Sequence, residues 1–247
     1  MSKNKHIFHG VFKQDNNDIV TSVRRRGYYL LKNFYTKNQI NFLNNFLTQA
    51  QKYYLKHFKI NDLLRINEFG ILRSPFSFSK KFLKTSICNK KIFKLVEMFL
   101  GQHYVLYSQV GVIDDGKKKL YQTRWHREIQ YQHFTSSQLM GLQIIIPLTK
   151  FNIKAPGTEI LPYSHLFEYP PSNNIIDNDR EFTNADIGDI ILMNPMTYHR
   201  SGFNRGIKRR ILTTTFVRPV FNIQFNHMLT IKKNNKYDFD SLNEKEK

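Results

Sequence analysis

Apolar residues recur at helical spacing in two stretches of the first hundred residues. Over 37–56 and again over 89–100 they return every three or four positions, which places them on one face of an amphipathic helix. In the first stretch these positions are Ile40, Leu43, Phe46, Leu47 and Ala50. Thr36 is a residue type that caps helix N-termini, and Gly101 is the type that ends helices. The pattern predicts two helices that pack by one face on the rest of the protein.

After residue 103 the helical spacing gives way to short β-rich runs separated by turn residues. These runs are 103–112, 124–130, 139–148, 159–162, 189–194 and 210–218. A further β-rich run, 27–34, precedes the first helix, and residues 57–86 have no regular pattern, so they are interpreted as loop-rich. A helical N-terminal segment followed by many short strands predicts a mainly β fold with packed helices, an antiparallel barrel or jelly roll.

The length and the two ends indicate the domain organisation. A chain of 247 residues corresponds to one large domain or two small ones. Residues 1–22 are polar and predict a loose lead-in, and residues 228–247 are polar and charged, which is typical of a frayed tail. We therefore expect a single domain over 23–227.

The chain is strongly basic, with 38 Lys and Arg residues against 19 Asp and Glu and a net charge of +19. The excess is spread over most of the chain, and no segment forms the clustered basic and aromatic groove that favours binding of a nucleic-acid strand. A nucleic-acid partner is therefore expected less than a small anionic substrate or cosubstrate. The sequence favours no particular oligomeric state.

Cysteine content and apolar runs indicate the compartment. Cys88 is the single cysteine, which excludes an intramolecular disulfide and a zinc site built from several thiolates. The first thirty residues lack the apolar core of a signal peptide, and the longest apolar runs are far too short to cross a bilayer. We expect a cytoplasmic globular protein without a membrane partner.

One short segment carries a metal-binding pattern. Residues i and i+2 of a strand point to the same side, so in the expected strand 124–130 the side chains of His126 and Glu128 lie next to each other. An imidazole and a carboxylate are two of the three ligands in the two-His-one-carboxylate triad that holds non-haem Fe(II). Taken alone, the pair is more typical of a solvated His and Glu on a strand edge.

A second segment adds the groups that such a site lacks. A turn at Gly188-Asp189 precedes an apolar strand that ends near His199, and a further strand begins with Arg210, eleven residues after the histidine. A third neutral imidazole would complete one face of an octahedral iron site. A guanidinium would bind the far carboxylate of a dicarboxylic cosubstrate, because arginine forms a planar two-pronged pair with carboxylates.

Together these segments resemble the phytanoyl-CoA dioxygenase-like group of Fe(II)- and 2-oxoglutarate-dependent oxygenases. The resemblance covers most of residues 24–220 and rests on several motifs jointly. They are the run Gly27-Tyr28-Tyr29-Leu30-Leu31, the helix capped by Thr36, the helix ending at Gly101, Trp125-His126-Arg127-Glu128, the segment 156–165 and the segment from His199 to Arg210.

The resemblance implies a double-stranded β-helix, a jelly roll of the cupin type, that holds iron through His126, Glu128 and His199. The group usually has Asp at the second of these positions, and the carboxylate that Glu128 keeps argues against a halogenase. Tyr163 stands where the group commonly has a Gly that supports a turn, so we expect the local geometry to differ there.

For the cosubstrate 2-oxoglutarate, the resemblance implies that its keto-acid end chelates the iron. Its distal carboxylate is expected to pair with Arg210, with the hydroxyl of Ser201 beside it. Arg209, the neighbouring candidate, is expected to face the other way because successive residues of a strand alternate. Gln109 matches a position that lines the cosubstrate or substrate pocket in related hydroxylases.

The implied function is oxidation of a small molecule, with Fe(II) as cofactor and 2-oxoglutarate and O2 as cosubstrates. The first expectation is hydroxylation of an unactivated C–H bond of a small-molecule substrate, anionic if the basic charge bears on it, with release of succinate and CO2. Two alternatives stay open: an oxygenase that acts on nucleic acid or nucleotides, and a catalytically silent double-stranded β-helix that only binds. The irregular segments 57–86 and 166–183 are expected to select the substrate.

Overall fold

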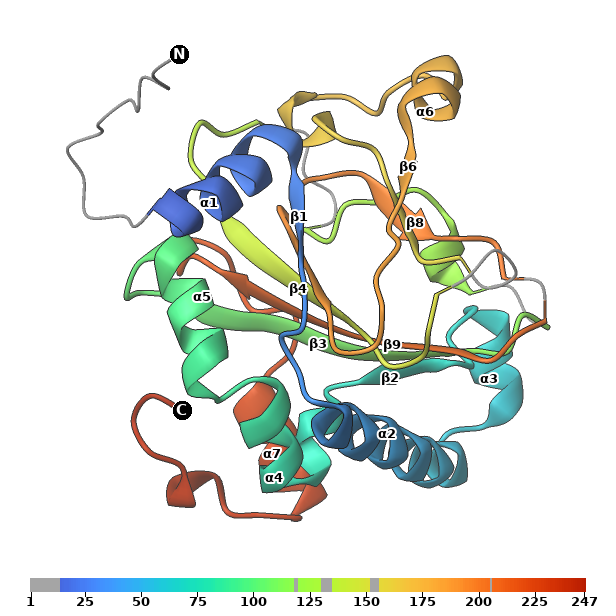
Figure 1. The fold of residues 1–247 in the computed structure, drawn as a ribbon. Helices are drawn as coiled ribbons and strands as arrows, with labels where there is room; N and C mark the ends of the chain where they lie inside the picture. Colours follow the sequence, from blue (N-terminus) through green and yellow to red (C-terminus); the bar gives the residue numbers. More distant parts are fainter. Residues whose placement is uncertain (1–13, 118–119, 130–134, 152–155, 205) are drawn as a thin grey trace.

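The centre of the protein is a six-stranded sheet in the order β1-β7-β4-β9-β3-β2, each strand antiparallel to its neighbours (Figure 1). The structure is a computed structural model and describes residues 14–117, 120–129, 135–151, 156–204 and 206–247. The strands are β1 (Tyr28–Leu31), β2 (Ile71–Arg73), β3 (Val105–Asp114), β4 (Gly141–Pro147), β7 (Ile190–Met193) and β9 (Arg209–Val217). Strands from both halves of the chain thus meet in one sheet.

A smaller sheet of three strands lies opposite one face of the large sheet, here called the inner face. Its order is β6-β5-β8, with β5 at Thr158–Ile160, β6 at Glu181–Phe182 and β8 at His199–Ser201. Figure 1 draws β6 and β8 above the large sheet, and side chains from both sheets line one cavity. Two facing antiparallel sheets are the architecture of a jelly roll, so the predicted mainly β fold with packed helices is confirmed.

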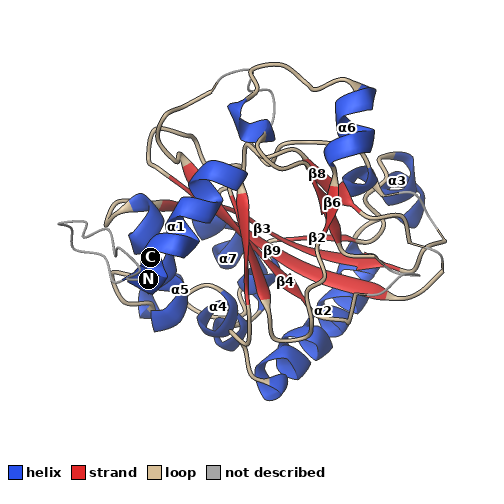
Figure 2. Cartoon of the chain, turned by 45° about the horizontal axis from the view of Figure 1, so that its top comes forward, coloured by secondary structure: helices blue, strands red, loops and turns tan. Residues whose placement is uncertain are grey.

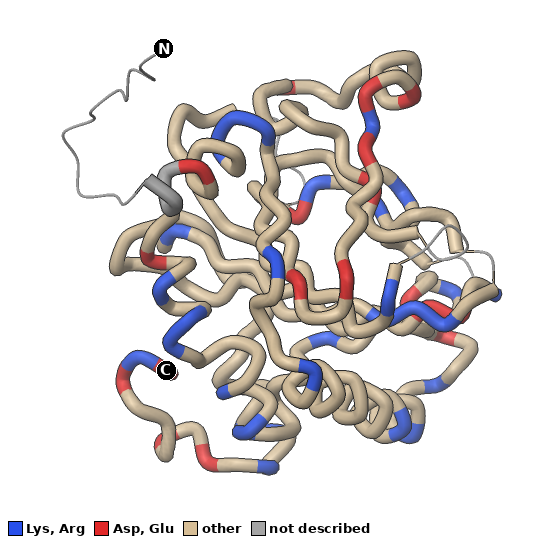
Figure 3. Tube along the Cα trace, in the orientation of Figure 1, with Lys and Arg blue, Asp and Glu red and all other residues tan. Residues whose placement is uncertain are grey.

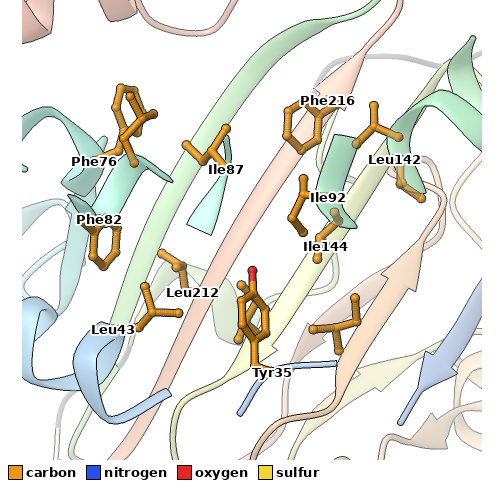
Figure 4. Packing of buried hydrophobic residues seen from close by; sticks show 14 of the residues in the cluster. Tyr35, Leu43, Phe76, Phe82, Ile87, Ile92, Leu142, Ile144, Leu212 and Phe216 are labelled. Atoms are coloured by element: carbon orange, nitrogen blue, oxygen red, sulfur yellow. The ribbon is translucent and has the colours of Figure 1, made fainter. Parts of the chain in front are cut away.

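Five of the seven helices that the structure describes, α1, α2, α4, α5 and α7, contribute side chains to the core on the opposite, outer face of the large sheet, whereas α6 lies beside the smaller sheet (Figure 2). The helices are α1 (Gln14–Arg26), α2 (Lys37–His57), α3 (Ile60–Arg65), α4 (Lys80–Ser86), α5 (Lys90–Leu100), α6 (Asn173–Asp179) and α7 (His227–Asn234), with short 3-10 turns η1 (Pro75–Phe78), η2 (Tyr121–Thr123), η3 (Ser164–Leu166) and η4 (Phe239–Ser241). Figure 4 shows Leu43 of α2, Phe82 of α4 and Ile92 of α5 packed with Ile144 and Leu212 of the sheet. Burial of this apolar cluster holds the helices on the sheet.

The pleat of the strands separates two cores. On β4, Leu142 and Ile144 belong to the helix-covered cluster, whereas Ile145 belongs to a second cluster on the inner face. Gln143, on the same side as Ile145, faces the cavity between the sheets. Because side chains of a strand alternate, each central strand contributes to both cores, and its sequence is apolar on both sides.

Both predicted helices begin and end as expected. The hydroxyl of Thr36 accepts a hydrogen bond from the Gln39 backbone N–H at the start of α2, and the Gln39 side chain accepts one from the Thr36 N–H at 3.0 Å. α5 ends at Gly101, whose φ of +79° lies in the left-handed region that glycine adopts readily. These caps satisfy backbone groups that a helix end would otherwise leave unpaired.

The prediction that residues 57–86 are loop-rich is wrong. This segment forms α3, β2, η1 and α4, and its side chains Leu63, Phe76, Phe82 and Leu83 are buried. Each element is at most seven residues long, so none gives a periodic pattern in the sequence. These short elements are stabilised by packing against the sheet and α2, and less by the intrinsic helix or strand propensity of their residues.

The two ends are more ordered than the sequence predicts. The second part of the expected lead-in, residues 14–22, lies in α1, where Ile19 and Val20 pack against the helix-covered core, while residues 1–13 lie outside the described part. The frayed tail is wrong as well, because α7 and η4 lie in it and Ile231 and Leu242 enter the helix-covered core. A few apolar side chains are enough to fix these polar segments on the protein.

Charged residues follow the spread expected from the sequence. Figure 3 shows Lys and Arg on helices, loops and strand ends throughout the fold, without one continuous basic stripe. Among the described residues, no helix has both the length and the apolar content that crossing a membrane requires.

Candidate active site

A cavity of about 320 Å³ opens between the two sheets. Its walls come from β3, β4 and β9 of the large sheet, from β5 and β8 of the smaller one, and from residues near β2 and η2. Polar side chains gather in it, among them His126, Glu128, Gln143, Thr158, His199, Ser201 and Thr213. Cavities of this size and mixed polarity typically hold small molecules.

The three expected metal ligands meet in this cavity. One ligand atom each of His126, Glu128 and His199 lie within 4.8 Å of one another. The two histidine ring centroids are 4.4 Å apart. Two imidazoles and one carboxylate at this separation can hold a single divalent transition metal on one face and leave the other face open. The sequence therefore identified a real cluster.

The strand expected over 124–130 is wrong, although it placed the ligands correctly. Among its described residues 124–129, only His126 forms a β-bridge, in which its backbone exchanges two hydrogen bonds of 3.0 Å with His199. The next backbone contact is from the Glu128 N–H to the Pro195 carbonyl at 2.9 Å, so the segment bends and does not extend the sheet. Gln130 lies outside the described residues.

Hydrogen bonds fix the orientation of both histidine rings. Nδ1 of His126 lies 2.7 Å from the Arg124 carbonyl oxygen, and Nδ1 of His199 lies 3.0 Å from that of Thr197. A carbonyl only accepts, so each Nδ1 carries the proton and each Nε2 keeps its lone pair, as in most metal-binding histidines. Burial, and then the neighbouring His126, lower the pKa of His199 to about 3, which keeps it neutral at physiological pH.

The carboxylate of Glu128 is held from the large sheet. Ser108 of β3 donates a hydrogen bond to Oε1 at 3.2 Å, and Gln143 of β4 donates one to Oε2 at 2.9 Å. These bonds orient the carboxylate toward the histidines despite the additional methylene that Glu has over Asp. Sequence reasoning missed both donors. The signal was present, since Gln143 interrupts the otherwise apolar run of β4.

Gln109 does not line the cavity, contrary to expectation. Its side chain is fully buried on the outer face of the sheet, where Nε2 donates to Ser86 Oγ at 3.1 Å and to Thr214 Oγ1 at 3.0 Å. Its neighbour Ser108 is the residue of β3 that faces Glu128. The two positions alternate along the strand, and a register shift between Leu106 and Ser108 prevented a correct assignment from sequence.

The two arginines at the start of β9 are placed opposite to expectation. Ile211 and Thr213 line the cavity, so the residue of the same face is Arg209. Arg210 points to the helices, where its Nη1 donates to Asn44 Oδ1 of α2 at 2.7 Å. A shift of one residue in register reverses every side chain of a strand, and the assumed register was wrong by one.

Arg209 is held in a buried network beside the smaller sheet. Its side chain is 1% exposed and forms a salt bridge of 2.8 Å with Asp114. Nη1 donates to the backbone carbonyls of Pro156 and Gly202, next to the smaller sheet. Its Nε is buried and has no hydrogen-bond partner among the described residues. A buried guanidinium with one unused donor is a candidate to bind a carboxylate.

Ser201 lies in the cavity as expected. It follows His199 by two residues on β8 and is paired in register with Thr158 of β5, which also lines the cavity. Tyr163, at the position where glycine was expected, has a φ of +64°, so the turn keeps a left-handed conformation without glycine. The smaller sheet therefore contributes two hydroxyl groups and one metal-ligand candidate.

The sequence matches the phytanoyl-CoA dioxygenase (PhyH) family over residues 23–212. The chain belongs to this family. The matched part covers well over half of the chain and contains all three candidate ligands. The comparison with curated proteins gives no match.

Solved structures share the fold of this PhyH family member. EctD from S. alaskensis with bound Fe is similar with a TM-score of 0.70 and 13% identity, over 89% of this chain and 83% of that one. The epimerase SnoN, in complex with Fe3+, alpha ketoglutarate and nogalamycin RO, gives 0.62 and 16% over 83% and 84%. The non-heme monooxygenase ThoJ with Ni gives 0.63 and 14% over 82% and 78%. At these identities the likeness establishes the jelly-roll fold.

Proposed function

We propose that this chain is an Fe(II)- and 2-oxoglutarate-dependent dioxygenase that hydroxylates an unactivated C–H bond of a small molecule, with release of succinate and CO2. The observation that carries the proposal is the cluster of His126, Glu128 and His199 inside the cavity between the two sheets. Membership of the PhyH family, and neighbours whose structures contain Fe and alpha ketoglutarate, support the choice of cofactor and cosubstrate. We take residues 23–227 as the unit that carries this activity.

The residues present fit an iron ion. Both Nε2 atoms are free of protons, the carboxylate is oriented by two donors, and His199 is 5% exposed, so the ligands are arranged before any metal binds. Iron bound there would supply the redox chemistry of O2 activation. The protein's own contribution is to keep His199 neutral by burial, to leave coordination positions open and to surround the site with the apolar walls of β3, β4 and β9.

For 2-oxoglutarate we propose Arg209 and Ser201 as the residues that bind the distal carboxylate. Ser201 lines the cavity. Arg209 reaches the backbone beside it through its hydrogen bond to the Gly202 carbonyl, and its buried Nε, which has no partner among the described residues, offers a charged donor. Arg210, which the sequence favoured, is bonded to Asn44 on the other face. Asp114 already pairs with Arg209 and keeps it charged in the buried network, since a buried guanidinium needs a counter-charge.

The cavity size supports a small-molecule substrate. Its volume of about 320 Å³ accommodates a cosubstrate and a compact second molecule, and the basic residues show no stripe that leads into it (Figure 3).

The first experiment is anaerobic addition of Fe(II) and 2-oxoglutarate to the purified protein, followed by visible absorption. A weak charge-transfer band from the chelated cosubstrate is expected in the wild type and in His103→Ala, which changes an exposed histidine. The band should be lost in His199→Ala. A folded wild-type protein without the band, or a band that persists in His199→Ala, would contradict the proposed function.

A further inference from the structure

An ion pair outside the metal cluster lies in the wall of the cavity. Arg73 of β2 and Glu68, which precedes that strand, both line the cavity. The Nε of Arg73 donates to Glu68 Oε2 at 3.1 Å, and Nη2 donates to Oε1. The side chains are 31% and 18% exposed, so a ligand can reach both from the cavity. We call Arg73, Glu68 and Gln122 the wall site, because Gln122 lines the same cavity and a backbone hydrogen bond of 3.3 Å joins its neighbour Tyr121 to Asn67, the neighbour of Glu68.

The charges of the wall site favour a ligand that is itself neutral overall but carries both signs. Among the described residues that line it, Arg73 is the single Lys or Arg, and Glu68 and Glu128 are the carboxylates. Glu128 belongs to the metal cluster, which leaves one positive and one negative group side by side. A purely anionic ligand would meet repulsion from Glu68, and a purely cationic ligand would meet repulsion from Arg73.

The wall site also has unused polar atoms of both kinds. The ion pair uses Nε and Nη2 of Arg73, and within the described part of the chain no partner is found for Nη1. Oε1 of Gln122 is buried and accepts no hydrogen bond, although Gln122 lines the same cavity. One free donor on a cation, and one free acceptor in the same cavity as a carboxylate, match a ligand that carries a carboxylate and an ammonium group.

Backbone strain brackets the pair. Asn67, directly before Glu68, has a φ of +58°, and Ser74, directly after Arg73, has a φ of +49°. Neither residue is a glycine, and such conformations cost free energy unless the surroundings fix them. They are fixed here: the Tyr121 N–H donates to the Asn67 carbonyl at 3.3 Å, and Ser74 is 2% exposed. Strained residues of this kind are concentrated at ligand sites.

We infer that the wall site recognises a small zwitterion of the α-amino acid type, with its carboxylate on Arg73 and its ammonium group on Glu68 and Gln122. This inference rests on the proposed function, since it names the substrate class of the same cavity. It replaces the anionic substrate that the basic composition favoured. The aromatic ring of Phe225, 5.2 Å from the Arg73 guanidinium carbon, supports the cation from its other side.

The test is calorimetric titration of the wild-type protein with the twenty L-α-amino acids. Each amino acid that binds is then compared with its analogue lacking the amino group and its analogue lacking the carboxylate. For leucine these are 4-methylpentanoate and 3-methylbutan-1-amine. At least one amino acid is expected to bind, and both of its analogues should bind at least about tenfold more weakly, because each leaves one charged group of the wall site unpaired.

Two single variants, one double variant and one control assign the binding to the wall site. Arg73→Gln and Glu68→Gln should each weaken amino-acid binding by about tenfold or more, whereas Arg180→Gln, which removes an ion pair remote from the cavity, should leave it unchanged. Since the single variants can disturb folding, the double variant Glu68→Arg with Arg73→Glu keeps an ion pair but exchanges the charges. It should unfold at a temperature close to the wild type and still bind poorly.

Each outcome decides the inference. It is overturned if no amino acid binds, if an analogue binds as tightly as its parent, or if Arg73→Gln or the exchanged pair binds normally. The charge-transfer band of the proposed function is measured on the same preparations. A band without amino-acid binding overturns this inference alone, and amino-acid binding without a band overturns the proposed function alone.

Discussion

The two faces of the large sheet are built from the same strands but have different roles: the outer face packs against helices, and the inner face contributes to the candidate site. The outer face packs large apolar side chains against α2, α4 and α5, and its buried polar groups, Gln109 and Arg210, bond to other protein groups. The inner face carries Gln143, which donates to Glu128 of the metal cluster, and Arg209, which forms a buried salt bridge with Asp114. Residues of identical type, such as Arg209 and its neighbour Arg210, thus have different environments according to the side of the sheet to which the strand pleat directs them.

Replacing each of the two arginines by alanine gives the largest expected contrast in 2-oxoglutarate affinity. Arg209→Ala should weaken 2-oxoglutarate binding by about 100-fold or more, since it removes a buried charged donor. It should also lower the free energy of unfolding by about 3–5 kcal/mol, because Asp114 is left buried without a partner. Arg210→Ala should leave the cosubstrate affinity unchanged. Calorimetric titration and urea unfolding measure the two effects.

Arg209→Lys separates binding from folding in this test. It keeps a positive charge beside Asp114 but loses the planar two-pronged pair with a carboxylate. Most of the stability should return while 2-oxoglutarate binding stays weak. If Arg210→Ala proves to be the variant that loses the cosubstrate, the assignment by strand face is wrong.

The outer face can be tested through the C-terminal segment. Ile231 of α7 is 2% exposed in the helix-covered core, so Ile231→Ala should lower the free energy of unfolding by about 2–4 kcal/mol. The charge-transfer band per folded molecule should not change. Ile175→Ala on α6, at 37% exposure, is the matched control and should cost less than about 0.5 kcal/mol. Equal effects of the two variants would show that α7 is not part of the core.

A pair of glutamines gives an intermediate contrast. Gln143→Leu removes a donor to Glu128 and should weaken metal binding by about 10–100-fold with little change in stability. Gln109→Leu should leave metal affinity unchanged and lower the free energy of unfolding by about 1–2 kcal/mol, because it breaks the bonds to Ser86 and Thr214. Competition with a chelator measures the affinity. Identical metal affinities in the two variants would remove the distinction between the faces.

The smallest expected effect is the pH-dependent stabilisation by Asp189, which lies outside the strands of the large sheet. Burial alone would raise the pKa of Asp189, but hydrogen bonds from Lys32 and from the N–H groups of Asn33 and Asp186 lower it below its ordinary value. Its stabilisation, about 1–2 kcal/mol, is present above the unfolded-state pKa of about 3.9 and is lost as pH falls through the lower folded-state pKa. Urea unfolding of Asp189→Asn and of the exposed control Asp177→Asn should therefore differ at pH 7 and converge toward pH 3. A constant difference would contradict this assignment.

The sequence predicted correctly those elements whose structure depends on residues close to one another in the chain. The helix over 37–56 combines a cap at Thr36 with an apolar stripe, and both are properties of neighbouring residues. The cluster of His126, Glu128 and His199 was found because the three side chains match a metal-binding pattern in residue type and order. The jelly roll followed from the density of short β-rich runs.

The errors came from features that only the assembled sheets determine. β9 is polar on both faces near its middle, with Thr213, Thr214 and Thr215 in succession, so its sequence does not reveal which side faces the cavity. The segment around His126 is held by a single bridge and has no strand of its own. Ile231 and Leu242 are isolated apolar residues in a charged tail. Hydrophobic periodicity needs several regularly spaced apolar residues, so it could not predict that these two are buried.

The order of the strands in the large sheet has a consequence for the time course of folding. β1, at residues 28–31, pairs with β7 at 190–193, and β3 pairs with β9 at 209–217, so most of the sheet waits for its last third to be synthesised. Pairings across such long sequence separations are slow, and unpaired strand edges exposed in the meantime are prone to aggregate. His126 and Glu128 likewise lack their third partner until β8 emerges. Metal binding is therefore expected late, after β8 has been synthesised. Until then, the helices are the elements available to cover the apolar surface of the growing polypeptide.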